Sequence, residues 1–255
     1  MAYVTPGSVV LVTGATGGIG FEIAAQAAAD GAVVGVHGSR PETVAKAIER
    51  LKTLAPDAKL IAAPGDFHEL EQIEAVVKKV ATEGGRLDSV INCATAGGPD
   101  STSGPFAKTN PHNFGVHTAS ILATFQQLCF AALPYLAENG GTIVGFASDA
   151  GRFAAPRQSM VGAAFGGIMA FVRNLALEVA RDNIRVHCIS PSFVVGTPVF
   201  ERFAGAGSRA TAAQERARLG LPSPKDIAPM TLFLCGPGAT KMTGQIISIN
   251  GGLNA

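Results

Sequence analysis

The stretch SVVLVTGATGGIGFEIAAQAAAD, residues 8–30, decides the fold of this chain. Its first six residues form an apolar run rich in β-branched side chains, which suits a strand covered on both faces in a parallel sheet. Glycines follow at positions 14, 18 and 20, and residues 18–30 have helical composition that stops at Gly31. A strand that enters a helix through a glycine-rich turn predicts the first half of a βαβ unit.

The same alternation continues to the end of the chain. We predict further strands at residues 32–37, 59–63, 88–92, 141–147, 184–189 and 245–249, and helices at residues 41–54, 68–82, 111–137, 158–180 and 224–234. This order predicts an α/β fold with one doubly wound sheet of seven parallel strands, in a single domain over residues 1–255. Residues 192–221 interrupt the pattern and predict a lid-like excursion over the carboxyl ends of the strands.

The composition limits the partners of this chain. Only 15% of its 255 residues are charged, against about 25% in an average soluble domain, and we therefore expect an oligomer. The formal net charge of +1 is too balanced for a protein that binds the phosphate backbone of nucleic acid. We find no targeting segment and no run of about 18 apolar residues, which predicts a cytoplasmic protein outside the membrane. The four cysteines lie too far apart in the sequence to indicate a metal site.

The turn between the first strand and the first helix predicts a dinucleotide site. Its glycines allow the turn and let a pyrophosphate approach the backbone at the positive N-terminus of the helix. A tight turn with a purely structural role is the alternative. The residues that we expect to contact the nucleotide here are Gly14, Thr16, Gly18, Ile19 and Gly20.

The end of the second strand indicates which nucleotide is preferred. An acidic residue at this position would bind the ribose hydroxyls of NAD and repel the extra phosphate of NADP. Here the chain has Ser39 and Arg40, a hydroxyl and a guanidinium that suit a 2′-phosphate. We therefore predict NADP(H) rather than NAD(H), the alternative being that Arg40 is a solvated surface charge.

The spacing TGxxxGxG at residues 13–20 resembles the short-chain dehydrogenase/reductase family, and the length and strand order match that family over essentially the whole chain. The resemblance implies a Rossmann-type fold, a nicotinamide dinucleotide and a small-molecule substrate. It also implies that Asp66 and Phe67 contact the adenine ring and that Thr197 contacts the nicotinamide carboxamide. Asn92 ends the fourth strand where the family has the sequence Asn-Asn-Ala-Gly, which here reads Asn92-Cys93-Ala94-Thr95.

The catalytic positions depart from the family, whose usual members use Asn, Ser, Tyr and Lys. By resemblance the serine orients the carbonyl, the tyrosine exchanges the proton, the lysine lowers the pKa of the tyrosine, and the asparagine holds a water. Ser148 fits the serine position. The asparagine, tyrosine and lysine positions are occupied by Ile121, Val161 and Phe165. We therefore expect the rate of ordinary ketone reduction to be very low.

No tyrosine or lysine is placed to act as a substitute, because the tyrosines are Tyr3 and Tyr135 and no lysine occurs between Lys108 and Lys225. His117 lies one helical turn before Ile121, and Asp149 directly follows Ser148. These two side chains are the possible replacement acids. A lone residue of either type is more often structural.

Three hypotheses remain open. In the first, the chain is a catalytically impaired pseudoenzyme beside an active paralogue in a hetero-oligomeric dehydrogenase, with a hydroxyacyl-CoA/oxoacyl-CoA couple as a possible substrate class. In the second, it is an NADPH-dependent reductase that reduces an iminium or an activated alkene. In the third, it is a nucleotide sensor or a non-redox catalyst. By resemblance, the partner, a second copy or a paralogue, would dock on the helices at residues 111–137 and 158–180.

Overall fold

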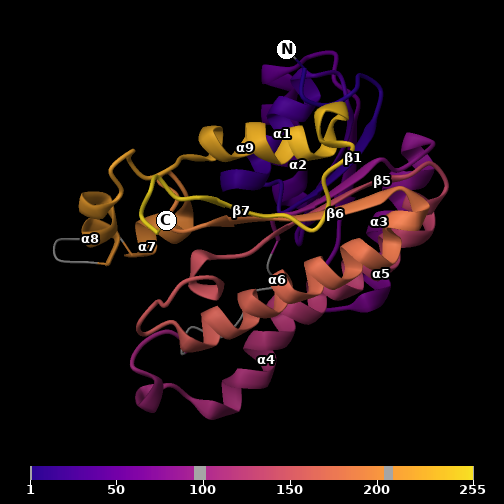
Figure 1. Ribbon diagram of the computed structural model, residues 1–255. Helices are drawn as coiled ribbons and strands as arrows, with labels where there is room; N and C mark the ends of the chain where they lie inside the picture. The colour runs from indigo at the N-terminus through magenta and orange to yellow at the C-terminus, as the bar shows by residue number, and fades with distance from the viewer. Residues whose placement is uncertain (1, 95–101, 204–208, 255) are drawn as a thin grey trace.

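Seven parallel strands form one sheet in the order β3-β2-β1-β4-β5-β6-β7 (Figure 1). The computed structural model describes residues 2–94, 102–203 and 209–254. The strands are β1 Val9–Thr13, β2 Val33–Gly38, β3 Leu60–Pro64, β4 Ser89–Asn92, β5 Gly141–Phe146, β6 Ile184–Pro191 and β7 Ile246–Ile249. The register pairs Val12 of β1 with Val36 of β2 on one side and with Ile91 of β4 on the other. The doubly wound parallel sheet predicted from the sequence is confirmed.

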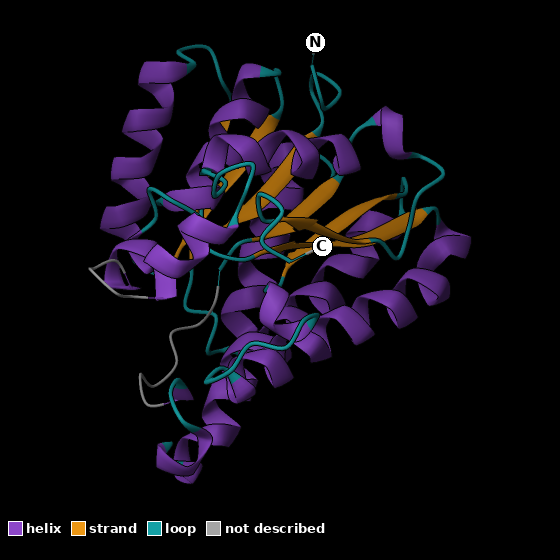
Figure 2. Ribbon diagram, turned by 60° about the vertical axis from the view of Figure 1, so that its left-hand side comes forward, coloured by secondary structure: helices purple, strands orange, loops and turns teal. Residues whose placement is uncertain are grey.

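Helices cover both faces of the sheet (Figure 2). One layer consists of α1 Gly18–Ala29, α2 Pro41–Leu54 and α9 Pro224–Cys235. The other consists of α3 Leu70–Gly84, α5 Thr124–Ala137 and α6 Ser159–Val179. Each layer packs a separate group of buried apolar side chains against its face of the sheet, which is why all five residues of β1 are buried.

Most observed helices begin and end within two residues of their predicted bounds, because local sequence signals determine these ends. Pro41 begins α2, where its missing N–H would have no helical partner in any case. Gly31, with φ +85°, follows the end of α1 in a conformation that side chains rarely adopt. At the start of α9, the Asp226 carboxylate accepts hydrogen bonds from the Ser223 N–H and hydroxyl at 2.8 and 2.7 Å.

The long helix predicted at residues 111–137 is not uniform. It begins with a 3₁₀ turn at Pro111–Asn113, continues as α4 Phe114–Thr118, and then widens into a π-helical turn at Ala119–Ala123 before α5. Apolar periodicity does not distinguish a π turn from an α-helix, because both leave the same residue types buried. The wider turn contains Ile121, the position where we expect the family's asparagine from the sequence.

The excursion at residues 192–221 contains two short helices, α7 Pro198–Phe203 and α8 Arg209–Arg216. The Val195 N–H donates to the Pro222 carbonyl at 2.9 Å, and the Leu219 N–H donates to the Gly251 carbonyl at 3.0 Å. These bonds hold both ends of the excursion near the carboxyl ends of the strands. Its function as a lid stays a prediction.

Candidate active site

The glycine turn after β1 has a backbone that only glycine accommodates. Gly14 and Gly18 have φ values of +65° and +53°. A Cβ atom at Gly14 would lie 2.9 Å from the backbone nitrogen of Ala94, and a Cβ atom at Gly20 would collide with the backbone of Gly14. The turn therefore presents bare backbone at the N-terminus of α1, and this geometry fits the pyrophosphate of a dinucleotide.

Thr16 and Thr197 bring two other segments to the glycine turn. The Thr16 methyl packs so closely on Gly38 that a side chain at position 38 would clash, so the turn lies against the end of β2. Thr197 lies beside Gly18, where a Cβ atom would be 3.7 Å from the Thr197 methyl. Its hydroxyl donates to the Val194 carbonyl at 2.8 Å and accepts the Phe200 N–H at 3.2 Å at the start of α7.

Ser39 and Arg40 are exposed directly after β2. Arg40 has no ion-pair partner among the residues that the structure describes. An exposed guanidinium can bind a phosphate, but the preference for NADP(H) stays a prediction.

A buried histidine, His37, contacts the backbone of the glycine turn. The Gly14 N–H donates to Nδ1 of His37 at 3.2 Å, and Nε2 lies 3.0 Å from the Gly65 carbonyl oxygen. The ring stacks on Phe67 with 3.9 Å between centroids. Burial lowers the pKa of His37 to about 4, so the ring is neutral at physiological pH. The sequence analysis treated His37 only as the end of a strand.

Two expected adenine contacts differ in their accessibility. Phe67 is 3% exposed and packs in the core, so its ring is covered by His37 and its neighbours. A nucleotide could reach Phe67 only through its backbone. Asp66 is half-buried, and its carboxylate accepts the His68 N–H at 3.0 Å.

Asn92 belongs to the interior of the sheet. Its Oδ1 accepts a hydrogen bond from the Thr13 hydroxyl at 2.7 Å, and the same hydroxyl accepts the Ala94 N–H at 3.2 Å. Asn92 therefore fixes the exit of β4 against the exit of β1. Burial raises the pKa of the neighbouring Cys93 thiol well above its usual range. Thr95 lies outside the described residues.

Ser148 caps the short turn Asp149–Gly151 after β5, where its hydroxyl oxygen accepts the Ala150 N–H at 3.3 Å. This turn rests directly on α6. A Cβ atom at Gly162 would lie 2.6 Å from the Ala150 carbonyl oxygen, and one at Gly151 would meet the backbone of Gly166 at 2.5 Å. Because the residues of α6 at this contact are glycines, the turn that follows Ser148 packs directly against the helix backbone.

The three positions where we expect the family's asparagine, tyrosine and lysine hold apolar side chains. Ile121 is 9% exposed and belongs to the core cluster, and the half-buried Phe165 packs against the same cluster. Val161 is half-buried in the first turn of α6. These side chains contain no group that can give or take a proton.

The structure gives the two possible replacement acids different surroundings. The Asp149 carboxylate is 2% exposed and accepts hydrogen bonds from the side chains of Ser190, Ser248, Asn250 and Asn254. It therefore acts as a buried acceptor that joins β5, β6, β7 and the C-terminal segment, and sequence reasoning missed this function. Its role as an acid stays a prediction.

His117 is also buried, with Nδ1 3.0 Å from the Thr102 hydroxyl. Its Nε2 has no partner among the described residues, and burial lowers the pKa of the ring. Within residues 2–94, 102–203 and 209–254, no three His, Cys, Asp or Glu side chains gather as metal ligands would.

Known sequences and structures resemble this chain over almost its full length. A family model described as enoyl-(acyl carrier protein) reductase matches residues 14–254. The 3α-hydroxysteroid dehydrogenase of Mediterraneibacter gnavus is 32% identical over 244 residues, 95% of each chain. The peroxisomal 2,4-dienoyl-CoA reductase of Saccharomyces cerevisiae is 32% identical over 251 residues, 97% of this chain and 84% of that protein. Levodione reductase has a TM-score of 0.89 at 26% identity, covering 97% of this chain and 98% of the other.

Proposed function

Because the chain belongs to the short-chain dehydrogenase/reductase family of NAD(P)-dependent oxidoreductases, we propose that it is the catalytically impaired subunit of a hetero-oligomeric dehydrogenase. In this proposal it binds NADP(H) and works beside an active paralogue on a hydroxyacyl-CoA/oxoacyl-CoA couple. One observation carries the proposal. The nucleotide end of the site keeps the geometry that a dinucleotide needs, whereas the expected proton-transfer positions hold the apolar side chains of Ile121, Val161 and Phe165.

The residues that would hold the nucleotide come from three segments. The backbone at Gly14, Gly18 and Gly20 would face the pyrophosphate, and Arg40 would pair with a 2′-phosphate. Thr197 would approach from α7. A bound nicotinamide supplies hydride chemistry, while the protein must supply the proton.

That proton is the missing part of a ketone reduction. A serine hydroxyl such as Ser148 donates a hydrogen bond to a carbonyl oxygen but does not readily release its proton at neutral pH. Loss of a positioned general acid typically costs about 10² to 10⁴ in rate. The isolated chain is therefore expected to reduce ketones far more slowly than an intact family member.

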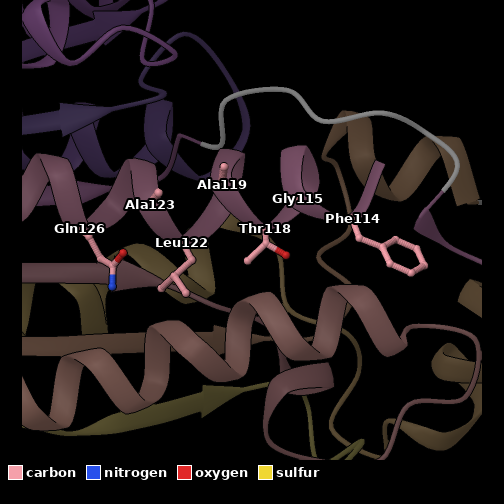
Figure 3. Close-up of a pocket in the computed structure, with 7 residues that line it drawn as sticks. All are labelled: Phe114, Gly115, Thr118, Ala119, Leu122, Ala123 and Gln126. Carbon is pink, nitrogen blue, oxygen red and sulfur yellow. The ribbon is translucent and has the colours of Figure 1, made fainter. Parts of the chain in front are cut away.

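The helices that would meet a partner have uncovered apolar faces. Phe130 of α5 and Leu177 of α6 are 70% and 79% exposed. A hollow of about 570 Å³ lies along α4, the π-helical turn and the start of α5. Leu122 lines this hollow and points toward the neighbouring helix (Figure 3). It packs so closely on α6 that a Cβ atom at Gly167 would lie 2.8 Å from its Cδ2. By length and mean hydropathy, Pro111–Ala137 and Ser159–Asp182 could also cross a membrane, but in this fold both pack beside the sheet. We propose that a second subunit covers their exposed sides in the cytoplasm.

Affinity purification of the tagged chain from its source cells tests the main proposal. We expect a stoichiometric partner of the same fold that carries a Tyr-x-x-x-Lys sequence, together with NADPH binding by the chain itself. The purified chain alone should show no turnover with 3-oxoacyl-CoA. Full ketone reductase activity of the isolated chain would overturn the proposal.

A second candidate is an NADPH-dependent reductase of an activated alkene. The family model is described as enoyl-(acyl carrier protein) reductase, and one relative is a 2,4-dienoyl-CoA reductase that produces a (3E)-enoyl-CoA. When a conjugated thioester accepts a hydride at carbon, negative charge develops on its carbonyl oxygen, where Ser148 can donate a hydrogen bond. A proton from water then completes the product at carbon. NADPH consumption with dienoyl-CoA, lost in Ser148→Ala, would favour this candidate over the first.

A further inference from the structure

A single histidine connects three segments around the adenosine end of the proposed nucleotide site. His37 is the next-to-last residue of β2, Gly14 lies in the turn after β1, and Gly65 follows β3. The side chain bridges the two glycines, and its own backbone carbonyl accepts the Ala15 N–H at 2.9 Å. We propose that His37 is a positioning residue that holds the glycine turn and the loop after β3 in the arrangement that binds the nucleotide.

The hydrogen bonds of His37 fix the position of its proton. The Gly65 carbonyl oxygen can only accept, so Nε2 carries the hydrogen. Nδ1 is then an acceptor, and it receives the Gly14 N–H at 3.2 Å. A neutral ring protonated at Nε2 therefore satisfies both glycines at once, and burial keeps the ring neutral.

The packing around His37 prevents the ring from turning away. The ring is 3% exposed and stacks on Phe67 at an interplanar angle of 27°. The Gly65 N–H also donates to the Gly38 carbonyl at 3.1 Å, which ties the same two strands together one residue further along. The hydrogen bond from the Gly14 N–H to the His37 ring therefore ties the first residue of the glycine turn to a side chain that cannot move away.

This inference rests on the proposed NADP(H) site, and it assigns His37 an effect different from that of Arg40. Arg40 would contact only the 2′-phosphate, whereas His37 sets the backbone that faces the pyrophosphate and adenosine common to both nucleotides. Removal of the His37 contacts should therefore weaken the binding of NADPH and the binding of NADH by the same factor.

Three variants at position 37 separate the contacts of the ring. His37→Asn keeps an acceptor near the position of Nδ1, His37→Gln keeps a donor near the position of Nε2, and His37→Phe keeps only the stacking on Phe67. His187 provides a matched control, because it is a fully buried histidine on β6 whose pKa burial also lowers to about 4. His187→Phe should change neither readout below.

Two measurements test the proposal. The first is hydrogen exchange of the Gly14 amide in the protein without nucleotide, where we expect His37→Phe and His37→Gln to accelerate exchange roughly tenfold and His37→Asn to stay near wild type. The second is calorimetric titration with NADPH and with NADH. Here His37→Phe should weaken the binding of both nucleotides roughly tenfold, and His37→Asn should weaken it by less than about threefold.

The outcomes distinguish this inference from the proposed function. Wild-type nucleotide affinity in a folded His37→Phe protein would overturn the positioning role, as would equal losses in His37→Asn and His37→Phe. If His37→Phe does not fold, the comparison of His37→Asn with His37→Gln decides in the same way. If the wild type binds neither nucleotide, the proposed function fails, and unchanged Gly14 exchange in the variants would overturn the role of His37 in holding the turn.

Discussion

At the scale of single residues, Arg40 offers the sharpest test of nucleotide choice. Its exposed guanidinium has no acidic partner among the described residues, so its removal should disturb no internal contact. We expect Arg40→Ala to weaken NADPH binding roughly tenfold, as the loss of a charge-assisted contact to phosphate would, and to leave NADH unchanged. Calorimetric titration with both nucleotides checks this prediction, with Lys46→Ala on α2, the helix that follows Arg40, as a control. Equal NADPH affinity in the variant would assign Arg40 to the solvated surface.

The positions where we expect the family's tyrosine and lysine should lose stability when they receive those residues. Phe165 is half-buried and packs against the core cluster, so Phe165→Lys would replace apolar contacts with a charged amino group. We expect a loss of about 2 to 3 kcal/mol in the free energy of unfolding, against about 1 kcal/mol for Phe165→Leu. Urea denaturation measures both variants. We also expect Val161→Tyr with Phe165→Lys to gain no ketone reductase activity, and substantial activity in a stable double variant would show that only two side chains are missing.

At the scale of elements, Asp149 joins the ends of β5, β6 and β7. Asp149→Ala would leave the buried Ser190 hydroxyl and Asn250 amide without their acceptor, and we expect a loss of about 2 to 4 kcal/mol in the free energy of unfolding. Asp149→Asn keeps one acceptor oxygen and should lose less. Denaturation and hydrogen exchange of the β7 amides measure these effects. An Asp149→Ala protein as stable as the wild type would show that water replaces the carboxylate.

The sequence predicted the elements better than the contacts between them. Pro41 and Gly31 determine helix ends through their own backbone preferences, so local reading placed α2 at its observed bounds and α1 to within one residue. The contacts of His37 with Gly65 and of Asp149 with Asn250 join residues 28 and 101 positions apart. No local pattern encodes such pairs, because they depend on which strands become neighbours. The glycine turn was predictable because its chemistry is contained in one stretch.

At the scale of the whole molecule, buried histidines predict a loss of stability in acid. Burial lowers the pKa of His37 and His187 to about 4, while the unfolded chain retains values near 6.5. The unfolded state therefore binds more protons between these values, so stability is complete above pH 6.5 and falls as the pH drops toward 4. Each histidine should cost about 2 kcal/mol at pH 5 relative to pH 7. Urea denaturation at pH 5 and at pH 7 checks this prediction. The variant His187→Phe should lose about half as much stability between these pH values as the wild type.

The uncovered helix faces predict that the purified chain associates. Phe130 and Leu177 project from the layer formed by α5 and α6, and contacts of such large apolar side chains with water are unfavourable by roughly 25 cal/mol per Å². We expect Phe130→Glu with Leu177→Glu to convert the oligomer to a monomer in light scattering, because a closed apolar interface would have to bury both charges. Leu54→Glu, at a 64% exposed position on α2 in the opposite layer, is the matched control and should leave the mass unchanged. An unchanged mass in the double variant would place the interface elsewhere, whereas a wild type that is already monomeric would indicate that these faces await a different chain.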